Sequence, residues 1–187
     1  MLKEPMLKEP ILKEPILLPF FDLRVLGIFE AEELIDQEPN KWNVISLSSK
    51  VWDHPRGEWV KESPNLEKCK NLIKCNFDDI DRPYKDLTLC KERDIINCIE
   101  FAEKCIGDSL LVHCHAGQRR SPTMAILIIL NNIKDKSDTP MLDACKHIFK
   151  IRDIARINQH ILNLGISLIA RNSEEEKAWF IESAMLR

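Results

Sequence analysis

The feature that most constrains the fold is the stretch SLLVHC, residues 109–114, which carries no charged residue and no alternation of apolar with polar side chains. A strand with one face in water usually alternates, whereas a strand of a parallel sheet covered on both faces reads as an apolar run. We therefore predict a buried strand of a parallel sheet at this place.

Similar patterns on either side of it predict alternating strands and helices. Strands are expected over residues 21–27, 42–48 and 71–77, and a helix over residues 30–37. A longer helix is expected over residues 88–107, with Thr88 as its cap and Gly107 at its end. Residues 51–65 read as a long connection.

The rest of the chain is mostly helical by the same criteria. Helices are expected from Ser121 to about Lys134, from Pro140 onward, and over residues 159–170 with Asn158 as cap. The order predicts an α/β fold, with a central, mostly parallel sheet flanked by helices and a helical C-terminal layer.

The chain has 187 residues, which suits one domain. Residues 1–19 contain LKEP repeats, and proline at every fifth position forbids a continuous helix, so we expect a mobile leader. One folded domain is expected over residues 20–172. A capping box at Ser173 predicts an extra C-terminal helix over residues 173–187.

Composition limits the partners that can be expected. The net charge of −3 does not indicate bulk nucleic-acid binding. The longest apolar run, residues 124–130, is too short to span a membrane, and no signal-peptide core is visible, so we expect a cytoplasmic protein. The 7 cysteines form no C-x2-C pair, and we therefore expect neither a metal site nor any other cofactor.

The candidate functional residues lie between the strand over residues 109–114 and the helix that begins at Ser121. Residues 115–119 form a short loop whose backbone N–H groups can converge on one point, and Gly117 suits such a turn. The helix N-terminus and the planar fork of Arg120 add positive potential. This arrangement stabilises two anions, a phosphate in the loop and a thiolate on Cys114.

The residues HCHAGQRRSP resemble the signature loop His-Cys-x5-Arg-Ser/Thr of cysteine-dependent protein tyrosine and dual-specificity phosphatases. The resemblance implies that Cys114 attacks phosphorus, that Arg120 binds the phosphoryl oxygens and that Ser121 helps the thiolate leave. His113 would support the loop. The substrate phosphate would be bound by His115, Ala116, Gly117, Gln118, Arg119 and Arg120.

The family also uses an aspartate as general acid, on a loop after an earlier strand. The segment CNFDDIDRP offers three candidates, Asp78, Asp79 and Asp81. Asp79 is the favoured acid because its place relative to Cys114 fits the family best, and the other two stay open. Alone, such a cluster would read as a solvated acidic turn.

The resemblance implies hydrolysis of phosphotyrosine in a protein or peptide through a phosphocysteine intermediate, with phosphoserine and phosphothreonine open. Arg119 departs from the family, which usually has a small residue there, and it places a second cation at the rim. A phosphoinositide or RNA 5′-phosphate substrate is therefore the alternative. Other readings are a phosphate-binding pseudophosphatase without turnover and a sulfur or arsenate transferase.

Overall fold

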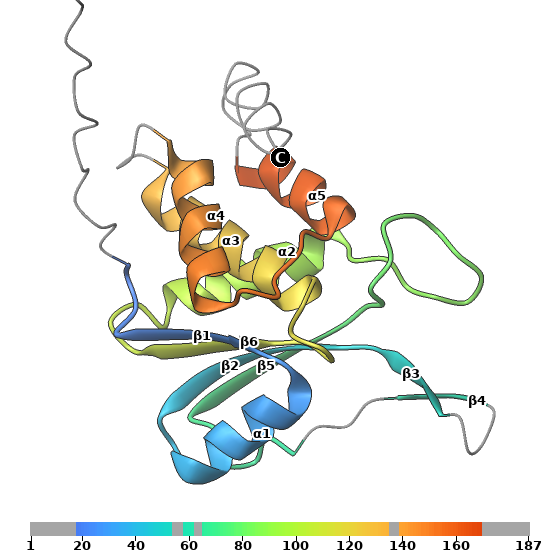
Figure 1. The fold of residues 1–187 in the computed structure, drawn as a ribbon, viewed down its shortest axis with the longest axis horizontal. Coiled ribbons are helices and arrows are strands. Elements are labelled where there is room, and N and C mark those ends of the chain that lie inside the picture. The colour runs from blue at the N-terminus through green and yellow to red at the C-terminus, as the bar shows by residue number, and fades with distance from the viewer. Residues whose placement is uncertain (1–17, 54–57, 62–64, 135–138, 170–187) are drawn as a thin grey trace, which may run out of the picture.

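A four-stranded parallel sheet organises the chain, in a computed structural model that describes residues 18–53, 58–61, 65–134 and 139–169 (Figure 1). Its order is β1 (Asp22–Leu26), β6 (Ser109–His113), β2 (Trp42–Ser48) and β5 (Asn71–Asn76). All three pairings are parallel, which confirms the predicted sheet.

The two central strands are buried along their whole length. Every residue of β2 and of β6 is buried, as expected for strands covered on both faces. Val112 of β6 lies in register between Val25 of β1 and Ile45 of β2, so apolar side chains meet across the middle of the sheet. β6 ends at the carboxyl edge of the sheet, so Cys114, the next residue, lies at that edge.

Helices cover both faces of the sheet, as Figure 1 shows, and confirm the helical C-terminal layer. One face carries α1 (Ile28–Gln37), and the other carries α2 (Glu92–Glu103), α3 (Arg120–Ile133), α4 (Pro140–Ile151) and α5 (Gln159–Ile169). Almost every residue of α3 is buried. A Cβ on Gly165 of α5 would lie 2.2 Å from Leu127 Cδ1, so α3 and α5 approach as closely as glycine allows.

The long helix over residues 88–107 was predicted too long at both ends. Its cap is Lys91 rather than Thr88, because Asp94 accepts a hydrogen bond from the Lys91 amide at 2.8 Å. The backbone of Thr88 is instead bonded to Asp78. Gly107 follows the helix after a further turn, in the left-handed region at φ 86°.

The expected connection over residues 51–65 contains a second, two-stranded antiparallel sheet of β3 (Lys50–Asp53) and β4 (Glu58–Lys61). Of the leader over residues 1–19, all but the last two lie outside the described residues, and so does the helix expected over residues 173–187. Both stay predictions. In the parts of the chain that the structure describes, no helix is both long and apolar enough to cross a bilayer.

Candidate active site

The thiol of Cys114 lies directly after β6, at the carboxyl edge of the sheet. Its side chain is 2% exposed, and its backbone amide donates to the Leu26 carbonyl at 3.4 Å. The hydroxyl of Ser121, in the first turn of α3, donates a hydrogen bond to Cys114 Sγ at 3.2 Å. The strand end and the helix start thus meet at the sulfur.

The loop between them, residues 115–119, is held by hydrogen bonds that surrounding residues donate to its carbonyl groups. The carbonyl oxygen of His115 accepts from the Ile28 amide at 2.9 Å, at the start of α1. The carbonyl oxygen of Gln118 accepts from the Arg156 amide at 2.7 Å, in the segment between α4 and α5. Segments on both faces of the sheet therefore form hydrogen bonds with the loop.

Arg152, the residue that ends α4, bonds the carbonyl groups of Ala116 and Gly117, which lie between those of His115 and Gln118. Its Nε donates to Gly117 O at 3.1 Å and its Nη2 to Ala116 O at 3.3 Å. Glu30 of α1 fixes the guanidinium through a hydrogen bond from Arg152 Nη1 at 2.8 Å. The hydrogen bond from Arg152 is also the main reason why the pKa of Glu30 is lowered.

These contacts determine where the loop amides point. In a trans peptide the C=O and N–H groups point in opposite directions. Because four successive carbonyl groups face the surrounding protein, the N–H groups of residues 116–119 face the other way, toward the inside of the loop. Converging amides of this kind form a concave site for an anion.

Gly117 is required both by its backbone conformation and by its surroundings. Its φ of 66° lies in the left-handed region, and a Cβ there would lie 2.5 Å from the Gly27 nitrogen. No larger residue could keep the loop this close to the junction of β1 and α1.

Arg120, the first residue of α3, is only 3% exposed and belongs to the same site. Its Nη1 donates to the Phe77 carbonyl oxygen at 2.9 Å, which joins the loop to the segment after β5. Its Nε is buried and has no hydrogen-bond partner among the described residues. A buried donor without a partner is costly, so this group is suited to receive an anionic ligand.

His113 is the last residue of β6 and is 1% exposed. Burial, together with the nearby positive charge of Arg120, lowers its pKa to about 4, although the backbone of Cys114 acts in the opposite sense. Neither ring nitrogen has a hydrogen bond of good geometry to a described residue. His113 is therefore a neutral, buried side chain near the loop at pH 7.

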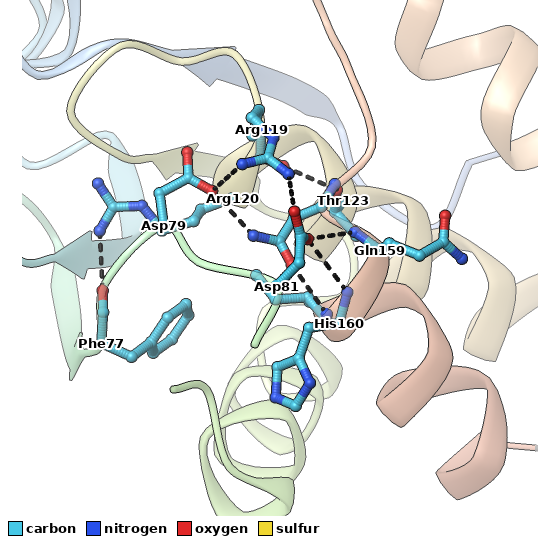
Figure 2. Close-up of polar contacts among 10 residues, drawn as sticks. Phe77, Asp79, Asp81, Arg119, Arg120, Thr123, Gln159 and His160 are labelled. Carbon is cyan, nitrogen blue, oxygen red and sulfur yellow. Dashed lines mark hydrogen bonds and ion pairs between the residues drawn. The ribbon is translucent and has the colours of Figure 1, made fainter. Parts of the chain in front are cut away.

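The three candidate acids have different surroundings. The carboxylate of Asp78, which is 7% exposed, accepts from the Thr88 amide at 2.7 Å, and the Asp78 amide donates to the Thr88 carbonyl at 2.7 Å. Asp78 therefore fixes the backbone of the segment. Asp79 and Asp81 are exposed in part and lie against Arg119 and the start of α5 (Figure 2).

Several contributors to this geometry lack a sequence signal. Arg152 belongs to no motif and reaches the loop from 35 positions away, so only the folded chain reveals it. Asn158 was predicted as a cap, and its side-chain oxygen does accept from the Ile161 amide at 3.0 Å. Its amide group also donates to Asp79 Oδ1 at 2.8 Å, which the helix pattern could not indicate.

No protein-family model and no curated protein sequence matches the chain. Among solved structures, DUSP15 has a TM-score of 0.57 at 20% identity and covers 88% of this chain and 92% of its own. Human DUSP28 has a TM-score of 0.54 at 14% identity, over 80% of this chain and 92% of its own. PTPMT1 in complex with PI(5)P has a TM-score of 0.50 at 17% identity, over 87% of this chain and 92% of its own. The chain therefore has the fold of the dual-specificity and protein tyrosine phosphatases.

Proposed function

We propose that the protein is a cysteine-dependent phosphoric monoester hydrolase, which removes phosphate from phosphotyrosine in a protein or peptide through a phosphocysteine intermediate. Phosphoserine and phosphothreonine esters are further substrates of the same chemistry. The proposal places the phosphate inside the loop of residues 115–119, against Arg120 and beside Cys114.

The observation that carries this proposal is the direction of the loop peptides. Four carbonyl groups are bonded to the surrounding protein, so the amides of residues 116–119 point away from it, toward the inside of the loop. The unpartnered Nε of Arg120 adds a charged donor. Such a set of fixed donors can stabilise the negative charge of a phosphoryl group in the transition state, because the donors need no reorganisation.

The proposed reaction has two steps. The Cys114 thiolate attacks phosphorus, a P–S bond forms, the ester P–O bond breaks, and Asp79 gives its proton to the departing oxygen. A water molecule then attacks the phosphocysteine, Asp79 takes a proton from it, and the P–S bond breaks. The Ser121 hydroxyl, which donates to Sγ at 3.2 Å, stabilises the thiolate as it leaves.

Hydrolysis of p-nitrophenyl phosphate and of a phosphotyrosine peptide, without added metal, tests the proposal. Cys114→Ser should abolish turnover and keep phosphate binding, because the loop amides and Arg120 remain. Arg120→Lys should also lose nearly all activity, since a point charge does not replace the planar fork. Activity that persists in Cys114→Ser would contradict the proposed nucleophile, and phosphate binding without turnover by the unaltered chain would support a pseudophosphatase.

A phosphoinositide is the second candidate substrate. It is supported by the similarity to PTPMT1, whose structure holds PI(5)P. The second cation, Arg119, was the sequence argument for a highly charged substrate. In the structure two carboxylates contact its guanidinium, which favours a simple phosphomonoester. Comparing kcat/KM for a phosphotyrosine peptide, a phosphoinositide and an RNA 5′-phosphate separates the three classes.

A further inference from the structure

We propose that Arg119 is a positioning residue for the general acid, and that its guanidinium fixes the segment of residues 78–81 on the phosphate-binding loop rather than binding substrate phosphate. This inference rests on the proposed phosphatase function and adds a specific role to a residue at which the chain departs from the signature of the family. Figure 2 shows the side chain of Arg119 between Asp79 and Asp81.

The contact between Arg119 and the acidic segment has two points. Arg119 Nη1 lies 3.2 Å from Asp79 Oδ1, and Nη2 lies against Asp81 Oδ2. The Arg119 side chain is 31% exposed, so solvent reaches this ion pair only in part. Two carboxylates held by one planar fork fix the orientation of the segment as well as its distance from the loop.

Asp81 is the anchor of this arrangement. Its second oxygen, Oδ1, accepts from the Gln159 amide at 2.9 Å and from the His160 amide at 3.4 Å, at the start of α5. Burial alone would raise the pKa of Asp81, but the hydrogen bonds from Arg119 and from these two amides lower it. Asp81 is thus held as a carboxylate and serves as counter-ion, not as proton donor.

Asp79 is held in a way that leaves one oxygen available. Arg119 and the side-chain amide of Asn158 both donate to Oδ1, at 3.2 Å and 2.8 Å. No described residue donates to Oδ2. The same oxygen therefore receives both contacts, while Oδ2 can carry the proton that the leaving group needs.

The backbone of Arg119 gives the guanidinium a fixed base. Its carbonyl oxygen accepts from the Thr123 hydroxyl at 2.7 Å, and that hydroxyl accepts from the backbone amide of Asn158 at 2.9 Å. Both Nη atoms of Arg119 contact carboxylates, and the negative charges of Asp79 and Asp81 oppose the approach of a phosphate to the same guanidinium. This geometry suits a positioning residue better than a ligand of the substrate.

The test compares an alkyl phosphate with p-nitrophenyl phosphate in the full chain, because only a poor leaving group depends strongly on the general acid. In Arg119→Met, kcat/KM for the alkyl ester should fall at least about tenfold more than for the aryl ester, within the roughly 10²–10⁴-fold that such an acid supplies. The inhibition constant of inorganic phosphate should change less than threefold. Arg119→Lys should recover part of the loss, since it can contact one carboxylate.

Two further variants separate position from charge. In Asp81→Asn, adding Arg119→Met should cost less than it costs in the unaltered chain, because the anchor is already lost. Arg82→Met removes a positive charge from the exposed neighbour of Asp81 and should show no difference between the two esters. Thermal unfolding of each variant reports whether the fold is kept.

Each outcome decides a different question. An equal loss on both esters in Arg119→Met, accompanied by weaker phosphate inhibition, would overturn the positioning role and make Arg119 a substrate ligand. Additive effects of Arg119→Met and Asp81→Asn would also overturn it. If the unaltered chain hydrolyses neither ester, the proposed function itself fails and the positioning role fails with it.

Discussion

Glu30 and Arg152, which are 122 positions apart in the chain, form a hydrogen-bonded ion pair at 2.8 Å beside the loop of residues 115–119. The pair joins α1, on one face of the sheet, to the end of α4, on the other. Its guanidinium also bonds the carbonyl groups of Ala116 and Gly117. The orientation of the loop peptides therefore depends on residues that lie outside the loop.

We predict that Arg152→Met weakens binding of phosphate and lowers kcat. Loss of the donor frees two peptide groups to rotate, so the amides of the loop are no longer held toward one point. We expect a loss of about tenfold in kcat/KM, on the scale of one or two hydrogen bonds. Arg156→Met is the matched control, because Arg156 holds the loop through its backbone amide, which the substitution keeps. Equal losses in the two variants would contradict this account.

Alanine at the two glycines with positive φ among the described residues should have unequal effects. Gly107→Ala meets nothing within 4 Å and incurs only the backbone cost of φ 86°, roughly 1–2 kcal/mol. Gly117→Ala adds the same strain to a Cβ only 2.5 Å from the Gly27 nitrogen, so it should destabilise the fold further and reduce activity. Urea unfolding and turnover of p-nitrophenyl phosphate measure both. Unchanged activity in Gly117→Ala would show that the loop can move away from β1.

His113 should make the protein less stable in acid. Burial lowers its pKa from 6.5 to about 4, so between these values the unfolded chain binds a proton that the folded chain does not. The free energy of unfolding should therefore fall as pH drops through this window, by at most about 3 kcal/mol. Urea unfolding at several pH values, with His113→Gln as control, measures the slope. An NMR titration that places the pKa of His113 near 6.5 would contradict the prediction.

Asp79→Asn should slow alkyl phosphates far more than p-nitrophenyl phosphate. A nitrophenolate leaves without a proton, whereas an alkoxide needs one. Asp78→Asn should have little effect, because the amide oxygen can still accept from Thr88, and Asp81→Asn should show only the smaller loss of an anchor. A dependence on the leaving group in Asp81→Asn but not in Asp79→Asn would move the general acid to Asp81. No dependence in any of the three would place the acid elsewhere in the chain.

The sequence was informative where a pattern is local. The strand over residues 42–48 has the predicted bounds, and all seven of its residues are buried. Pro140 lies at the start of its helix, and Asn158 caps the next one. The loop after Cys114 was visible because Gly117, Arg120 and Ser121 lie within five consecutive positions.

Contacts between distant residues were not predictable in the same way. Thr88 resembled a helix cap, yet Asp78 competes for its backbone and the helix begins at Glu92. Arg119 looked like a free cation at the rim, and only the fold brings two carboxylates to it. An arginine carries no local mark of the partner it will find 38 or 40 positions away.

The outward-facing carbonyl groups of the loop also define how far the domain can be shortened. A fragment that ended with α3 would keep Cys114, Arg120 and all three aspartates, and therefore every candidate catalytic residue that the sequence indicates. It would lack the donors from Arg152 and Arg156 that turn the loop peptides, as well as the helix start that holds Asp81. The smallest unit that keeps the proposed site therefore extends into α5, and the helices after the loop are part of that site rather than a removable addition.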